Sequence, residues 1–298
     1  MTDPIQFKTI QVTPRAGITA AHVYGVKWED MSDEQFNEIQ EAWRIHGVLV
    51  CQGPIGSDEA MVKFSKRLGV VCIQSLQEKG HPLSHAEHEE ICLIKESYNS
   101  NTGNNRLAPH YDLHWHKDNE IPTHIILWPH SLPDKGPATL FYDPYAFFND
   151  LTEEERAILA DKSIICQSCY AFEGPLFYGI NEPHGQMPFS RRPILLKDKE
   201  GRPFVSPGPF TPSTFVPDLP QDKGRELIDS LQARFFSDKY RIRLDWKPDN
   251  VVLARNNFMH SRDDYDGKKQ PRTMHQILTR DPEVGDGFWL PYTRLSSS

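Results

Sequence analysis

Four stretches of the chain repeat apolar residues at the three- and four-residue spacing of an amphipathic helix. The first stretch begins with a capping box at 32–35, and a second capping box joins Thr152 to Glu155. Glycine, which favours the turn that ends many helices, closes two of the stretches. We therefore expect helices from Ser32 to Gly47, from Ser57 to Gly69, from Thr152 onward, and from about Asp222 to Phe236.

Most of the remaining apolar positions form short runs or alternate with polar positions, as strands do. The clearest case is 240–246, in which Tyr240, Ile242, Leu244 and Trp246 share one face. Strands are expected at 48–53, 123–128, 138–142, 240–246, 251–254 and 273–278. Because strands dominate and no repeat or low-complexity linker divides the chain, we predict one mainly β domain over 1–298, with helical decoration. Its expected architecture is a jelly-roll or cupin-like double sheet.

Composition and charge exclude several classes of protein. The chain is 38% hydrophobic and 25% charged, as globular domains are, and its net charge of −8 disfavours a binder of nucleic acid or anionic membranes. The N-terminus lacks the features of a secretory signal, and no apolar stretch approaches the roughly 18 residues of a membrane span. Five cysteines, an odd number, favour reduced thiols. We expect a cytoplasmic protein that acts on a small molecule, with homo-oligomerisation left open.

The strongest chemical signal is the run HWHKD at 114–118, answered far downstream by His260 and Arg272. On an extended strand His116 and Asp118 would project from the same face, so both could reach one point. Two imidazoles and one carboxylate that leave coordination positions open are the ligand set typical of non-haem Fe(II) oxygenases. An arginine after the distal histidine could hold an acid cosubstrate through a bidentate salt bridge.

The order of several short motifs resembles the TauD/TfdA family of Fe(II)- and 2-oxoglutarate-dependent oxygenases. The resemblance covers roughly residues 15 to 280, and it implies the double-stranded β-helix fold of that family. The matching segments are Trp115–Asp118 (W-H-x-D), Gly136–Phe141 (G-x-x-T-x-[WF]), the helix at Gly224–Phe236, Asn257–Arg262, and Arg272–Gln276.

This resemblance implies a set of roles for the matching residues. His116, Asp118 and His260 would bind Fe(II), Arg272 would pair with the distal carboxylate of 2-oxoglutarate, and Thr139 would hydrogen-bond the same group. With O2, such a centre releases succinate and CO2 and produces an oxidant for an unactivated C–H bond. The ligand carboxylate favours hydroxylation, or desaturation and ring closure, over halogenation.

Two positions depart from the family pattern. Gln276 replaces a second arginine that helps anchor an anionic substrate in sulfonate- and phenoxyacetate-using relatives, so a taurine-like substrate is disfavoured. Asp112 stands where taurine dioxygenase has a substrate-contacting amide, and its carboxylate could receive an ammonium. The two positions together suggest an amine or amino-acid-like substrate.

Two other interpretations stay open at this stage. A zinc metallohydrolase could use His114, His116, Asp118 and His260, and a cupin-like protein could bind a metal or ligand without catalysis. Binding alone gives no reason for open coordination positions beside a carboxylate-binding arginine. The oxygenase interpretation is therefore favoured.

Two further patterns carry less weight. His81, His85 and His88 have helical spacing and suggest zinc, whereas the polar residues around them favour a solvated loop or short helix. Cys166 and Cys169 form a C-x-x-C pattern that follows a strand-like run instead of opening a helix. That placement favours buried core cysteines over a redox pair.

Overall fold

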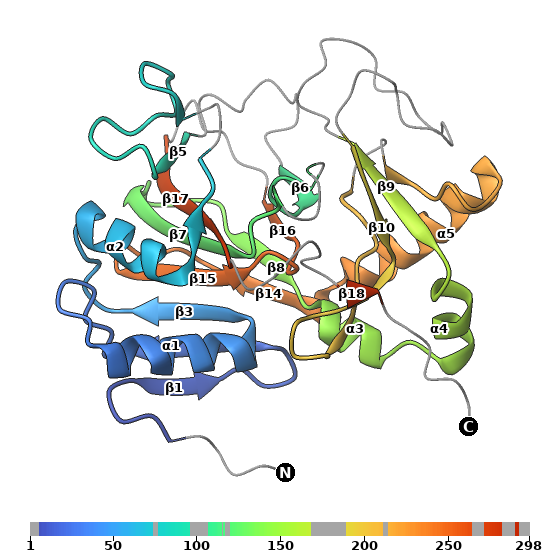
Figure 1. The fold of residues 1–298 in the computed structure, drawn as a ribbon, viewed down its shortest axis with the longest axis horizontal. Coiled ribbons are helices and arrows are strands. Elements are labelled where there is room, and N and C mark those ends of the chain that lie inside the picture. The colour runs from blue at the N-terminus through green and yellow to red at the C-terminus, as the bar shows by residue number, and fades with distance from the viewer. Residues whose placement is uncertain are drawn as a thin grey trace.

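The chain folds into a mainly β structure. Figure 1 shows the computed structural model, in which a broad β layer with two helices beside it occupies one half of the molecule. Further strands and helices occupy the other half. The structure describes residues 6–73, 77–95, 107–114, 116, 120–167, 189–210, 214–263, 271–281 and 290–291.

All four predicted helices form, and three of them begin at the predicted caps. The Ser32 and Ser57 hydroxyls accept hydrogen bonds from the backbone N–H three residues further on, and the Thr152 capping box forms reciprocally. A short helix that apolar spacing did not reveal follows Asp143, whose carboxylate caps it. The helices are α1 (Asp33–His46), α2 (Asp58–Leu68), α3 (Pro144–Asn149), α4 (Glu153–Leu159) and α5 (Gln221–Phe235), with a 3-10 turn at Asp238–Tyr240.

The larger sheet has eight strands and is antiparallel except for one pair. In spatial order its strands are β1 (Gln11–Pro14), β2 (Ala20–Tyr24), β3 (Val48–Gln52), β15 (Asn250–Arg255), β7 (His124–Ser131), β17 (Thr273–Arg280) and β4 (Val70–Val71). The eighth strand, β5 (Cys92–Lys95), also pairs with β17. Only β2 and β3, among the described strand pairs, run parallel.

Alternation along the strands divides the larger sheet into two buried faces. One face packs against α1 and α2 through residues such as Leu49, Ile126 and Leu253. The opposite face enters a second hydrophobic core that it shares with the smaller sheet. That core includes Val50, Leu127 and Val252 from the larger sheet, and Leu140 and Ile242 from the smaller one.

The smaller sheet has four strands in the order β14 (Arg241–Leu244), β8 (Thr139–Tyr142), β16 (His260–Arg262) and β6 (Leu107–His110). Two three-stranded sheets lie outside it. One contains β10 (Phe189–Pro193), β9 (Ser163–Gln167) and β13 (Thr214–Phe215), and the other contains β12 (Pro203–Val205), β11 (Leu195–Lys197) and β18 (Leu290–Pro291).

The predicted strands all form with shifted ends, but the strand premise behind the HWHKD motif is wrong. Strand β6 ends at His110, and the chain then turns, with Leu113 in the left-handed region at φ 55°. The backbone N–H of His116 donates to the Leu113 carbonyl over 2.9 Å, which closes this turn. His116 therefore lies outside any strand.

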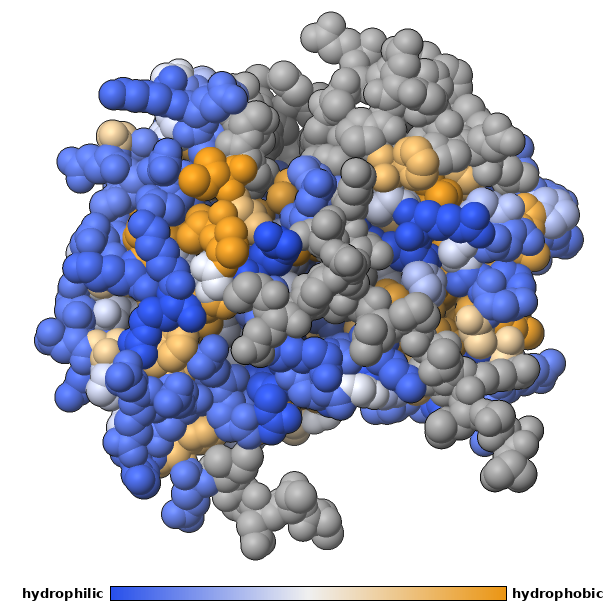
Figure 2. Space-filling view, in the orientation of Figure 1, coloured by the Kyte–Doolittle hydropathy of each residue, from blue (hydrophilic) through white to orange (hydrophobic). Residues whose placement is uncertain are grey.

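The described surface that faces the viewer in Figure 2 is mostly hydrophilic, with apolar side chains in limited patches. Within the described part of the chain, we find no helix with the length and apolar character needed to cross a membrane.

Candidate metal centre

Strands β6 and β16 bring together two histidines and one aspartate. His260 pairs with His110 across the two strands, and their ring centroids lie 4.4 Å apart. Asp112 follows β6 by two residues, and its Oδ1 lies 3.8 Å from His110 Nε2. One ligand atom from each residue lies within 4.8 Å of the others. We call His110, Asp112 and His260 the His110 group.

The electrostatics of the His110 group suit a bound cation. Burial, and then the neighbouring His110, lower the pKa of His260 well below its usual value, so its ring is neutral and can donate a lone pair. Burial raises the pKa of Asp112, although His110 and a hydrogen bond from Gln276 oppose that shift. The Nδ1 atom of His260 is buried without a hydrogen-bond partner among the described residues. A metal ion would balance the carboxylate and engage the imidazoles.

Two amide side chains fix the position of Asp112. Asn256 is fully buried; its Oδ1 accepts from the Asp112 backbone N–H over 2.9 Å, and its Nδ2 donates to the Asp112 carbonyl over 3.0 Å. Gln276 Nε2 donates to Asp112 Oδ2 over 3.0 Å. Partners of this kind orient a ligating carboxylate. The two residues predicted to contact substrate, Asp112 and Gln276, therefore contact each other.

The histidine predicted from the sequence as the first iron ligand lies elsewhere. The His116 side chain is 37% exposed, and its Nδ1 lies 3.4 Å from Glu120 Oε2. Its carbonyl accepts a hydrogen bond from Arg192 over 3.2 Å. Asp118 lies outside the described residues. Among the described residues of the predicted ligand set, His260 belongs to the His110 group and His116 does not.

A signal for the His110 group is present in the sequence. His110, Tyr111 and Asp112 form a second H-x-D six residues before the one at 116–118. His114, which also featured in the hydrolase alternative, is buried, and its Nδ1 lies 3.1 Å from the Tyr111 carbonyl. His114 therefore contacts the backbone of the turn.

The two residues expected to bind 2-oxoglutarate are both buried near the start of β8. Arg272 donates through Nη1 to the Pro137 carbonyl over 3.3 Å, two residues before Thr139. Trp246 Nε1 donates to the Thr139 hydroxyl over 2.8 Å. On the neighbouring strand Arg262 lies directly opposite Thr139, two residues after His260. Thr139 thus lies on the same sheet as His110 and His260, and Arg272 contacts the segment just before it.

The structure describes one cysteine of the C-x-x-C pattern and the histidines of the 81–91 loop. Cys166 is buried on β9, while Cys169 lies outside the described residues. His81 Nδ1 accepts from the Leu83 backbone N–H over 3.1 Å, so His81 stabilises its own turn. His85, four residues further on, contacts other elements of the fold.

A family model described as taurine catabolism dioxygenase TauD, TfdA family, matches residues 9–278. The chain belongs to the TauD/TfdA family. It is therefore an oxidoreductase, a dioxygenase that depends on α-ketoglutarate (2-oxoglutarate). The family uses Fe(II) together with this cosubstrate.

Individual members of the TauD/TfdA family align over nearly the whole chain. The chain is 25% identical to pentalenolactone F synthase of Streptomyces arenae, over 91% of this chain and 95% of that one. It is also 25% identical to (S)-phenoxypropionate/alpha-ketoglutarate-dioxygenase of Delftia acidovorans, over 93% and 97%.

Solved structures share the fold. A putative alpha-ketoglutarate-dependent taurine dioxygenase from Burkholderia xenovorans superposes with a TM-score of 0.72 at 16% identity, covering 91% of this chain and 92% of that one. AAD-2 in complex with Mn(II) and N-oxalylglycine superposes with a TM-score of 0.69 at 17% identity, covering 91% and 97%. The mainly β architecture is thus that of TauD-like dioxygenases.

Proposed function

We propose that this chain oxidises a small organic molecule at a C–H bond, and that the His110 group holds its Fe(II). One observation carries the assignment: the donor atoms of His110, Asp112 and His260 converge within 4.8 Å at the paired ends of two strands. Two imidazoles and a carboxylate are the donor set of Fe(II) oxygenases. The alternative ligand pair predicted from the sequence is His116 with Asp118.

The chain's own residues bind, orient and shield the reacting groups. When bound, Fe(II) with 2-oxoglutarate and O2 supplies the oxidant and releases succinate and CO2. Asp112 offsets part of the metal charge, and Asn256 and Gln276 hold it in place. Arg272 and Thr139 would bind the distal carboxylate of 2-oxoglutarate, because a buried guanidinium forms a strong bidentate pair with a carboxylate.

We infer that the two facing sheets form a double-stranded β-helix within one oxygenase domain. The hydrophobic core that both sheets share supports this inference, since side chains from each sheet, such as Leu127 and Ile242, pack into it. The family match over residues 9–278 leaves no room for a second domain of ordinary size inside the chain.

The structure changes the inference about substrate. The Asp112 carboxylate lies in the His110 group and accepts from Gln276, so it has a role other than receiving an ammonium. We therefore do not retain an amine or amino-acid-like substrate. The relatives' names refer to pentalenolactone F and phenoxypropionate, which supports a small organic molecule oxidised by hydroxylation, or by desaturation and ring closure.

Family membership weighs against the two alternative functions. A zinc metallohydrolase needs neither 2-oxoglutarate nor O2, and a cupin-like binding protein needs no cosubstrate arginine. The α-ketoglutarate-dependent relatives, together with the buried Arg272, favour the oxygenase.

The test is an anaerobic titration of metal-free protein with Fe(II) and 2-oxoglutarate, which follows the visible charge-transfer band of the chelated 2-oxo acid. His110→Ala should abolish the band, and His116→Ala, the matched change in the other H-x-D, should retain it. Loss of the band in His116→Ala with retention in His110→Ala would instead assign the metal to His116 and Asp118. Absence of the band from folded wild-type protein would refute the oxygenase proposal itself.

A further inference from the structure

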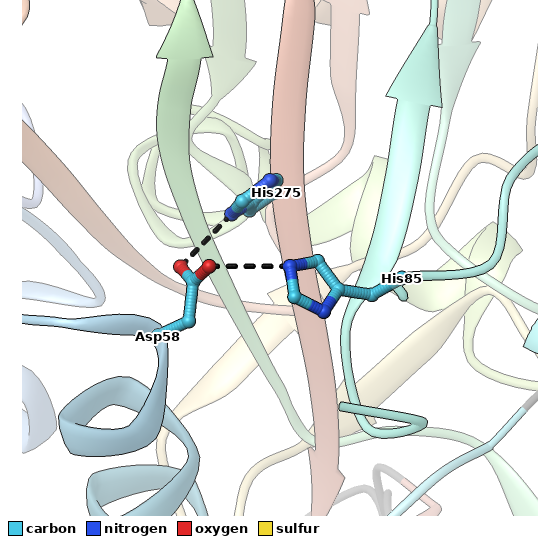
Figure 3. A group of neighbouring side chains, drawn as sticks. All are labelled: Asp58, His85 and His275. Atoms are coloured by element: carbon cyan, nitrogen blue, oxygen red, sulfur yellow. Dashed lines mark hydrogen bonds and ion pairs between the residues drawn. The ribbon is translucent and has the colours of Figure 1, made fainter. Parts of the chain in front are cut away.

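A second group of side chains of the types that bind metals gathers around His275 on β17. Figure 3 shows Asp58 from the start of α2, His85 from the loop before β5, and His275 from β17 pointing toward one another. Asp58 Oδ1 lies 3.1 Å from His275 Nδ1, and Asp58 Oδ2 lies 3.2 Å from His85 Nε2. One ligand atom of each lies within 4.8 Å of the others. We call these three residues the His275 group.

Two further imidazoles surround the His275 group. His88 stacks on His85 with ring centroids 5.4 Å apart, and His130 stacks on His275 at 4.8 Å. Burial lowers the pKa of His275, which favours the neutral ring that can donate a lone pair to a metal ion. Two carboxylates are close by: Asp58 faces His85 and His275, and Glu59 Oε2 lies 3.9 Å from His88 Nδ1.

We propose that Asp58, His85 and His275 bind a divalent transition-metal ion, with Zn²⁺ as the best match. Zinc takes nitrogen and carboxylate oxygen donors in four-coordinate sites, and three protein ligands leave one position for water. The Asp58 side chain is 31% exposed, so the ion and that water have access from solvent, while the buried His275 anchors the inner side. The site shares no residue with the His110 group, and its presence does not depend on the proposed function.

Metal binding at this site has a specific consequence for one turn of the chain. His85 Nδ1 accepts from the backbone N–H groups of Glu87 and His88 over 3.2 and 3.1 Å, so in the metal-free ring the proton sits on Nε2 and points to Asp58. An ion bound at Nε2 moves that proton to Nδ1, with no net proton released from a neutral ring. The two N–H groups then lose their acceptor, whereas a purely hydrogen-bonded cluster would keep them protected.

Such an ion would join three elements that are distant in sequence. It would bind the start of α2 and the 81–91 loop to β17, which begins directly after Arg272 and carries Gln276 next to His275. We therefore expect the ion to tether these elements and to hold in place the strand that begins directly after Arg272, the proposed cosubstrate arginine.

The experiment counts zinc in the tag-free full-length protein after equilibrium dialysis, by inductively coupled plasma mass spectrometry. The wild type should bind one equivalent more than His85→Ala or Asp58→Asn; the latter preserves side-chain volume in case the former fails to fold. His81→Ala is the matched control, because His81 belongs to the same loop, is not one of the three proposed ligands, and accepts a hydrogen bond from the Leu83 backbone N–H. It should bind as much zinc as the wild type.

Under the proposed function the His110 group holds Fe(II), and Zn²⁺ in the dialysis buffer would also bind that donor set, so His260→Ala separates the two sites. Combining it with His85→Ala should remove the zinc that either single variant retains. If His85→Ala and Asp58→Asn bind as much zinc as wild type, the second site does not exist. Hydrogen exchange gives an independent readout: zinc should accelerate exchange at the amides of Glu87 and His88. Slower or unchanged exchange there would refute zinc ligation by His85 Nε2.

Discussion

Asn256 is the residue whose removal should most disturb the His110 group without deleting a proposed ligand. Its side chain is fully buried and makes three hydrogen bonds: to the backbone N–H and carbonyl of Asp112, at 2.9 and 3.0 Å, and to the Pro122 carbonyl at 2.9 Å. Asn256→Leu keeps a similar volume but leaves all three backbone groups without that partner. The turn that carries Asp112 would then lose these hydrogen bonds to the residue that follows β15.

The magnitude follows from the cost of an unsatisfied buried polar group, about 1–3 kcal/mol each. Three groups predict a loss of roughly 3–9 kcal/mol in the free energy of unfolding, out of about 5–15 kcal/mol for a typical domain. Because Asp112 is only partly buried, water can satisfy some of these groups. We therefore expect a value near the lower end, about 3 kcal/mol.

The assay is urea unfolding followed by tryptophan fluorescence, with Fe(II) affinity measured in parallel. Asn257→Leu is the matched control, since its buried side chain donates one hydrogen bond, to the Tyr145 hydroxyl over 2.8 Å. The control should cost about 1 kcal/mol and leave Fe(II) affinity unchanged, whereas Asn256→Leu should weaken Fe(II) binding about 10–100-fold. Equal stability losses with unchanged Fe(II) affinity in both variants would refute the reasoning.

Two further predictions concern the cosubstrate and pH. Trp246→Phe removes the 2.8 Å hydrogen bond to Thr139, so the Kd for 2-oxoglutarate should rise about five-fold while Fe(II) affinity stays constant; a parallel loss of Fe(II) affinity would contradict this role. Burial lowers the pKa of His124 to about 3 from its ordinary 6.5, so only the unfolded state gains its proton as pH falls below 6.5. The free energy of unfolding should then fall by up to about 1.4 kcal/mol per pH unit between pH 6.5 and 3, and His124→Gln should flatten this slope in urea titrations. An unchanged slope would show that His124 is not responsible.

The helices could be predicted from the sequence because their determinants are local. The caps at Ser32, Ser57 and Thr152 lie within three residues of the backbone groups that they bind. The short helix after Asp143 was missed because it spans little more than a turn and a half and is buried on more than one side. A helix of that kind has no polar face to set a periodic pattern.

The metal centre could be predicted in kind but not residue by residue. The chain contains two H-x-D patterns within nine residues, and spacing alone does not distinguish them. The structure favours the first, because β6 pairs with β16 and sets His110 opposite His260, which is 150 residues away in sequence. Strand pairing at that separation leaves no local signature. The Arg272 and Thr139 assignments depend on the order of motifs and stay predictions.

The hydrogen bond from Gln276 to Asp112 has a consequence for altering the enzyme's selectivity. Where some relatives have a substrate-anchoring arginine, this chain has an amide already bonded to a proposed metal ligand. A guanidinium at position 276 would face the Asp112 carboxylate first and would draw negative charge away from the iron. Changing selectivity at this position would therefore reduce metal affinity, so pocket redesign in this enzyme is better directed at side chains that do not contact the ligands.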